Sequence, residues 1–194
     1  MASETKAKQS YKYRVADSIL GTEADEYRLS QEEYYRLHLF YVTHSLCKGQ
    51  SLKGVDFVHY GWASNSVKNP DLEIALMSVL NLRRNSLFIF TDKDDLATRF
   101  SENSLEDGRV DDLSSERAVV GKTSAGNNYL KLFYRIRDCF AHGKFKLRIS
   151  EQGEKMVVMQ DDNTSSVTAR IVLKLDTLLG FIDAIDRNRV LESC

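Results

Sequence analysis

Residues 127–145 read NNYLKLFYRIRDCFAHGKF. Apolar and aromatic residues recur through this segment at helical spacing, and no proline interrupts them. Gly143 stands where the helix should end, because glycine most readily takes the left-handed backbone conformation that closes a helix. The segment therefore predicts one amphipathic helix from about residue 127 to about residue 141.

Arg137 has an unusual position on this expected helix. On a wheel of about 100° per residue, Leu130 and Phe133 fall within about 40° of it, so the arginine lies inside the apolar stripe. The polar arc carries Asn127, Lys131, Arg135 and Asp138. Removing an unpaired guanidinium from water costs several kcal/mol, so Arg137 must be paired, extend to the surface, or reach an anion in a cleft.

His142 lies at the end of the same helix, immediately before the glycine. An imidazole titrates near neutral pH and can move protons, while a guanidinium can bind phosphate through two parallel hydrogen bonds. A regular wheel separates Arg137 and His142 by about 140°, although the last helical turn can depart from ideal geometry. From the residues alone, phosphodiester chemistry and a structural ion pair with a capping histidine both stay open.

Downstream of this helix, the sequence predicts a small β-structure and a last helix. Residues 144–149 (KFKLRI) and 155–160 (KMVVMQ) surround EQGE and indicate a β-hairpin. Residues 168–173 are a candidate third strand. A helical apolar stripe follows in VLKLDTLLGFIDAIDRN, residues 172–188.

Upstream, the pattern favours helices. Residues 24–48 predict one or two of them, and Asn69-Pro70 opens a run, DLEIALMSVLNLRRNSLFIF, that is apolar on nearly every side and predicts a buried central helix. Residues 91–118 hold nine acidic and four basic residues, a net charge of -5. This stretch is expected to be a mobile, solvated surface insertion with one short helix near Leu96, or a docking surface for a basic partner.

These elements predict a mainly α fold, a helical bundle with a small C-terminal β-hairpin and a final helix. Residues 1–10 are expected to form a flexible tail, and residues 11–194 a single domain with the acidic insertion at about 91–118. The chain has 194 residues, 42% of them hydrophobic and 28% charged, which is ordinary globular composition.

Charge and cysteine usage exclude several classes of protein. The net charge of -1 lacks the excess of basic residues with which a protein coats nucleic acid by charge alone. The three cysteines are far apart and fit neither a disulfide framework nor a zinc site, and His38 and His44 are not spaced to share a metal. No segment resembles a signal peptide or a membrane span, so a cytoplasmic protein with no metal, no cofactor and no membrane partner is expected.

The heptapeptide RDCFAHG, residues 137–143, resembles the Arg-X4-6-His signature of the HEPN superfamily, in which a polar residue follows the arginine and a glycine follows the histidine. Many members place this motif at the end of a late helix in a bundle. Two departures stand out. Asp138 occupies a position where asparagine is frequent, and Lys144 stands where one toxin branch carries a modified tyrosine.

The resemblance implies a metal-independent endoribonuclease, a toxin or phage-defence effector that leaves 2′,3′-cyclic phosphate and 5′-hydroxyl ends. It implies that Arg137, His142 and Asp138 are catalytic, with RNA as the substrate and a homodimer with a composite active site as the active form. Lys131, Arg135 and Lys144 are the expected RNA contacts. An antitoxin or regulatory partner is a further partner that the resemblance allows. The open alternatives to a nuclease are a non-catalytic RNA-binding or protein-interaction module and a helical scaffold.

Overall fold

The computed structural model describes residues 18–43, 70–79, 87–106, 108–121, 128–163 and 166–187. Its helical elements are α1 (Gln31–Leu37), the π-helical turn η2 (His38–Thr43), α2 (Pro70–Val79), the 3-10 turn η4 (Lys93–Asp95), α3 (Leu96–Glu102), α4 (Asn128–Ala141) and α5 (Leu175–Arg187). Its strands are β1 (Leu87–Thr91), β2 (Arg117–Gly121), β3 (Phe145–Ile149), β4 (Lys155–Asp162) and β5 (Val167–Lys174).

The five strands form one mixed sheet in the order β1-β2-β5-β4-β3. β1 and β2 are parallel, and α3 lies between them in the chain, as a parallel connection requires. The other neighbouring pairs are antiparallel. The register of β4 against β5 shifts between Asp161 and Asp162, an irregularity that lies beside α4 and matters for the site.

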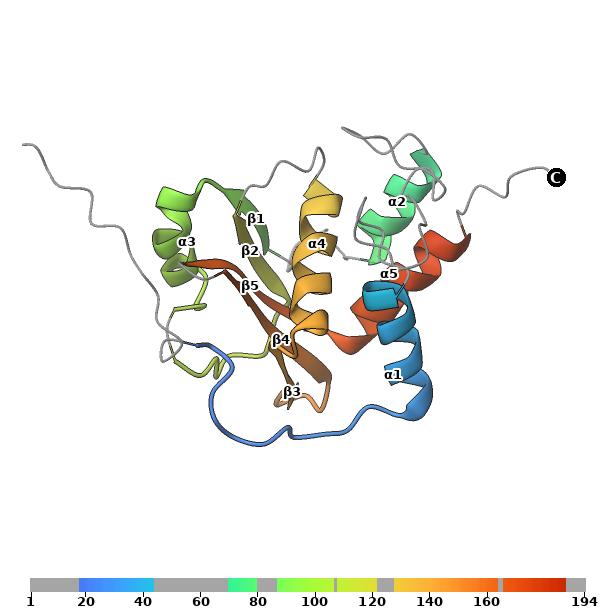
Figure 1. Cartoon of the computed structure of the whole chain (residues 1–194), viewed down its shortest axis with the longest axis horizontal. Coiled ribbons are helices and arrows are strands. Elements are labelled where there is room, and N and C mark those ends of the chain that lie inside the picture. The colour runs from blue at the N-terminus through green and yellow to red at the C-terminus, as the bar shows by residue number, and fades with distance from the viewer. Residues whose placement is uncertain are drawn as a thin grey trace, which may run out of the picture.

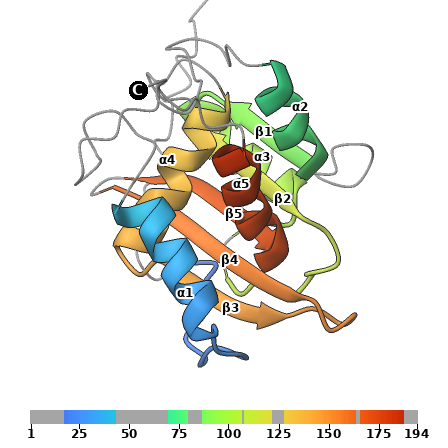
Figure 2. The same ribbon diagram turned by 90° about the vertical axis from the view of Figure 1, so that its right-hand side faces the viewer.

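Helices cover both faces of the sheet, which makes a three-layer arrangement (Figures 1 and 2). Successive side chains of a strand point to opposite faces, and the two apolar clusters follow this alternation. Val157 and Met159 face the larger cluster, which includes residues of α1, α2, α4 and α5, whereas Met156 and Val158 face α3. α4 is therefore fixed against one face of the sheet by its apolar side.

The expected mainly α fold, an HEPN-like bundle with only a small hairpin, is wrong. The structure has an α/β fold in which the sheet is the central layer. The long helix expected after Asn69-Pro70 is the main source of the error. Helix α2 does begin at Pro70, but LFIFT is strand β1. A short buried strand shows a continuous apolar run, which periodicity alone cannot distinguish from part of a buried helix.

The acidic stretch 91–118 also differs from a solvated excursion. It contains the end of β1, η4, α3 and the start of β2. Leu96, Phe100, Leu105, Val110 and Leu113 are buried in the cluster on that face of the sheet. Its charged residues cover an apolar layer that completes the parallel crossover.

The C-terminal half matches the sequence expectations closely. The helix before Gly143, the hairpin β3–β4, the third strand β5 and the last helix α5 are confirmed within a few residues. Residues 1–10 and His44 lie outside the described residues.

Candidate functional site at the end of helix α4

Two arginines lie at the two edges of the buried face of α4. That face is centred on Ile136, and its other fully buried members are Leu132, Phe133 and Cys139. On a helical wheel, Arg137 lies about 100° to one side of Ile136, and Arg135 lies about 100° to the other side. Arg137 therefore lies at the border of the apolar stripe and not inside it. Arg135 lies at the opposite border, although the helical wheel had placed it on the polar arc.

A Schellman motif ends α4. Lys144 N donates to Cys139 O at 2.8 Å, and Gly143 N donates to Phe140 O at 3.4 Å. Gly143 has a φ of 65°, the left-handed conformation predicted for it. This arrangement makes His142 the residue that caps the helix, and its side chain is exposed. The turn thus fixes the backbone of His142 and leaves its imidazole exposed to solvent.

Asp138 links the two motif residues. Arg137 Nη1 donates to Asp138 Oδ1 at 2.6 Å. His142 N donates to Asp138 O at 3.1 Å, so the helix is regular up to His142, which lies one turn beyond Asp138 on the same face. The ion pair therefore holds the Arg137 guanidinium beside Asp138, and His142 follows Asp138 by one turn of the helix.

Arg135 is engaged in a different way. Its Nη1 donates to Oδ2 of Asp161 at 2.7 Å, and the two side chains are only 15% and 6% exposed. The Thr168 hydroxyl also donates to Asp161 Oδ2. Burial raises the pKa of the Asp161 carboxyl, although the bonds from Thr168 and Arg135 favour its charged form. This pair joins α4 to the sheet across β4 and β5.

Lys144 belongs to the same flank. Its Nζ forms an ion pair with the Asp162 carboxylate and donates to Asp162 O at 3.2 Å. Successive residues of a strand normally point to opposite faces of the sheet. The register shift between Asp161 and Asp162 explains why both carboxylates nevertheless bind cations of the α4 region. Lys131, about three turns before His142 in α4, donates to Asn128 Oδ1 at 3.3 Å.

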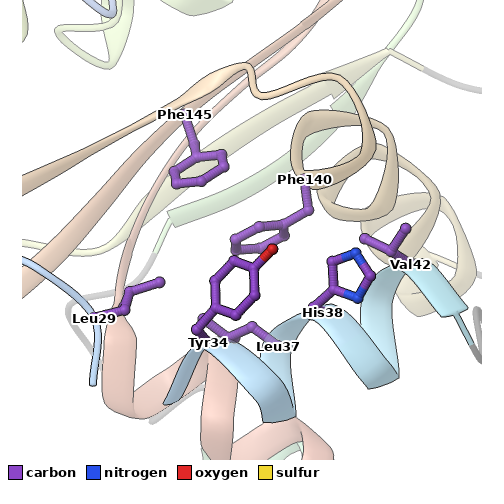
Figure 3. A pocket seen from close by; sticks show the side chains of 7 residues that line it. All are labelled: Leu29, Tyr34, Leu37, His38, Val42, Phe140 and Phe145. Atoms are coloured by element: carbon purple, nitrogen blue, oxygen red, sulfur yellow. The ribbon is translucent and has the colours of Figure 1, made fainter. Parts of the chain in front are cut away.

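A pocket opens on the other side of the same helix end. Figure 3 shows its seven lining side chains, which are Leu29, Tyr34, Leu37, His38, Val42, Phe140 and Phe145. Its volume is about 180 Å³. A wider groove of about 720 Å³ shares Leu29, Tyr34 and Phe145 with it and extends along the segment that precedes α1.

Backbone bonds fix the walls of this groove. Glu26 N donates to Leu147 O at 2.8 Å, and Leu147 N donates to Asp25 Oδ1 at 3.0 Å, so the segment before α1 covers the edge strand β3. At the start of α1, the Ser30 side chain and the Glu33 side chain bind each other's backbone N–H in a capping box. Both walls of the groove are therefore built on ordered backbone.

His38 begins the π-helical turn that follows α1. Its Nδ1 lies 3.4 Å from Thr43 Oγ1, five residues further on, which is the spacing that a π-turn brings together. The imidazole stacks on Tyr34, with the ring centroids 5.7 Å apart and the planes 26° from parallel. The sequence indicated only that His38 is a core or surface histidine and that Tyr34 belongs to the helical apolar spacing of residues 24–48.

The expected site residues divide into two groups. Arg137 pairs with Asp138 and His142 is exposed one turn later, while Arg135 and Lys144 are held by Asp161 and Asp162. Tyr34, His38, Phe140 and Phe145 were missed as pocket residues. The S-x-x-E pattern at 30–33 could have placed the start of α1, but nothing in the sequence announces the π-turn.

Burial raises the pKa of the Cys139 thiol well above its usual range, so this cysteine packs as an apolar side chain. Within the described residues, His, Cys, Asp and Glu form no group of three placed to hold a metal ion. None of the helices described is both long and apolar enough to span a bilayer. The homodimer, the regulatory partner and the role as a toxin or phage-defence effector stay predictions.

Comparison with protein-family models, with curated proteins and with solved structures finds no match to this chain.

Proposed function

We propose that this chain is a metal-independent endoribonuclease whose reaction centre is the exposed end of α4. One observation carries the proposal: Asp138 holds the guanidinium of Arg137 on the helix face where His142 lies one turn later. A phosphate-binding cation and a proton-transferring imidazole thus share an accessible surface. These are the two functions that internal transesterification of RNA needs.

Arg137 would stabilise the phosphate in the transition state. Its side chain is 22% exposed, so an anion can reach it from solvent. Its Nε is buried without a hydrogen-bond partner, as is the Nε of Arg135, so a phosphate would bind through the Nη atoms. As charge develops on the non-bridging oxygens, the guanidinium would bind them more strongly than in the ground state.

His142 would move the proton. In one step the ribose 2′-oxygen loses its proton and bonds to phosphorus, while the bond between phosphorus and the 5′-oxygen breaks. The 2′-proton is accepted by a base, and the departing 5′-oxygen receives a proton from an acid. His142 is assigned one of these two transfers, solvent water accepts or supplies the other proton, and the products are a 2′,3′-cyclic phosphate and a 5′-hydroxyl. No water is consumed.

Asp138 and Lys144 have supporting roles in this proposal. Asp138 is a positioning residue, because it orients Arg137 and does not itself need to contact RNA. Lys144 follows the His142-Gly143 turn directly and, with Lys131 on α4, would bind flanking phosphates. Arg135 is assigned to holding α4 on the sheet, since its Nη1 already binds the buried Asp161.

The test is cleavage of a labelled single-stranded RNA by purified full-length protein in excess EDTA. We expect cleavage by the wild type, a rate lower by about 10²–10⁴ for His142→Ala, and a comparable loss for Arg137→Ala. Arg99→Ala is the matched control, because Arg99 also pairs with a carboxylate of its own helix, Glu102, at 2.8 Å, but lies on α3 across the sheet.

Full activity of His142→Ala, or equal losses in Arg137→Ala and Arg99→Ala, would contradict the proposal. RNA binding without cleavage by the wild type would instead identify a non-catalytic RNA-binding module. Asp138→Asn tests whether Asp138 acts by positioning Arg137 or through its negative charge. The amide can still accept a bond from Arg137, so we expect it to retain more activity than Asp138→Ala.

A further inference from the structure

We propose that the pocket between α1 and the end of α4 binds one unpaired nucleobase of the RNA, next to the phosphodiester that Arg137 and His142 act on. The identity of the ligand rests on the proposed function. The pocket itself is an independent feature of the structure, and its test below does not require cleavage.

The walls of the pocket are aromatic on two sides. Tyr34 and His38 form a stacked pair on the α1 side, and Phe140 and Phe145 form the other side with ring centroids 5.0 Å apart. In Figure 3 the Tyr34 side chain extends from α1 toward these phenylalanines. Proteins that bind single-stranded nucleic acid use such rings as platforms on which bases stack.

The position of the pocket connects it to the reaction centre. Phe140 precedes His142 by two residues and Phe145 follows it by three, with the Schellman turn between them. Consecutive Cα atoms are about 3.8 Å apart, so either phenylalanine Cα lies within about 12 Å of that of His142. A base held between these residues is therefore separated from His142 only by the Schellman turn.

Polar atoms in the pocket suit the edge of a base. His38 directs Nδ1 to Thr43, so Nε2 is the ring nitrogen through which it can bind a base edge, and the Tyr34 hydroxyl offers a second donor and acceptor. Arg28 lines the wider groove that continues from the pocket, where it can bind a backbone phosphate. Asp25 lies in the same groove and accepts the bond from Leu147 N.

The size of the pocket favours a single planar ring over a protein surface. The pocket is a concave space of about 180 Å³, so it accepts one ring-sized group and not an extended protein surface. An exposed aromatic pocket with a few polar atoms, adjacent to cations, is complementary to one base and its phosphate.

The test measures affinity for a labelled single strand of 2′-fluoro RNA, which lacks the attacking 2′-hydroxyl and cannot be cleaved by the proposed route. Fluorescence anisotropy would be recorded for ten-nucleotide homopolymers of each base. Tyr34→Ala should weaken binding of the preferred homopolymer by about five- to 150-fold, as expected for loss of one stacked base. Tyr34→Phe keeps the ring and should bind within about threefold of the wild type.

Tyr35→Ala is the matched control. Tyr34 is 57% exposed and Tyr35 is 61% exposed on the same helix, but only Tyr34 lines the pocket. Tyr35→Ala should therefore bind like the wild type. A homopolymer with abasic sites in place of its bases should abolish the difference between Tyr34→Ala and the wild type.

Equal affinities of Tyr34→Ala and Tyr35→Ala, or no binding by the wild type, would overturn the base-pocket inference. So would a change in oligomeric state that Tyr34→Ala alone produces without a change in RNA affinity, because the pocket would then be a contact between two copies of the chain. Base binding by a protein that does not cleave RNA would overturn the proposed function and leave the pocket inference standing.

Discussion

Arg135 Nη1 lies 2.7 Å from Asp161 Oδ2, whereas Arg137, two residues later on the same helix, binds Asp138 beside it. The first pair joins two layers of the molecule, and the second spans adjacent residues on one helix. The two arginines of the motif region therefore have different roles. We expect Arg135 to stabilise the fold, and we propose that Arg137 binds a ligand.

Stability measurements distinguish these roles. Arg135→Ala should lower the free energy of unfolding by about 3–5 kcal/mol, because it leaves the Asp161 carboxylate buried without its partner. Arg137→Ala should change it by less than about 1 kcal/mol, since its pair with Asp138 is partly exposed. Urea denaturation followed by circular dichroism measures both. A loss in Arg137→Ala as large as that in Arg135→Ala would make Arg137 a structural residue.

Gly143 controls the position of His142. Gly143→Ala should cost about 1–2 kcal/mol of stability, because an alanine at a φ of 65° is strained even though a Cβ there meets no atom within 4 Å. We expect RNA cleavage to fall as well, since the Schellman turn sets the direction of the imidazole.

Gly153→Ala is the control for this prediction. Gly153 also has a left-handed backbone, with a φ of 81°, and also has no atom within 4 Å of an added Cβ. It lies in the β3–β4 turn, so the stability cost should be similar and the cleavage rate unchanged. Equal cleavage by Gly143→Ala and Gly153→Ala would show that the turn does not position a catalytic group.

The sequence predicted the part of the molecule that carries the site better than the layer that supports it. The helix over 128–141, the turn at Gly143 and the strands that follow have distinct periodicities and stop signals. LFIFT and RAVVG do not, because each is a five-residue strand with buried neighbours on both faces. Their pairing depends on a parallel crossover between segments far apart in the chain, which no local pattern encodes.

The site residues show the same division. Helical spacing identified the unusual position of Arg137, but it assigned Arg135 to the solvent face. Only the register of β4 shows that Asp161 faces α4 and captures Arg135. The aromatic pocket depends on the fold of the segment before α1 against β3, so His38 and Phe145 have no relationship that can be derived from the sequence.

The pH dependence of stability should carry the signature of Glu116. This carboxyl is mostly buried and accepts a hydrogen bond from Lys174 N at 2.8 Å, and burial raises its pKa from 4.5. The folded state then keeps the proton to higher pH than the unfolded state. Its contribution to stability is fully present below pH 4.5 and is lost as pH rises through the raised folded pKa.

Urea denaturation of Glu116→Gln at a series of pH values measures this effect. The unfolding free energy of the wild type, relative to the variant, should decrease as the pH rises above 4.5. Asp112→Asn should show the opposite pH dependence of the unfolding free energy. Bonds from the Ser114 hydroxyl and N–H lower the pKa of Asp112, so its contribution to stability is lost as pH falls below 3.8. If the difference in unfolding free energy between the wild type and Glu116→Gln stays constant as the pH rises above 4.5, the pKa of Glu116 is not raised in the folded state.

The most direct measurement of the central claim is the chemical identity of the cleaved ends. A short RNA is incubated with the wild-type protein in excess EDTA, and the products are analysed by mass spectrometry alongside an identical RNA that carries a single 2′-deoxynucleotide at the cleavage position. We expect a 2′,3′-cyclic phosphate and a 5′-hydroxyl from the first RNA and no cleavage of the second at that position. Products with a 5′-phosphate, or cleavage that persists at the 2′-deoxynucleotide, would contradict it.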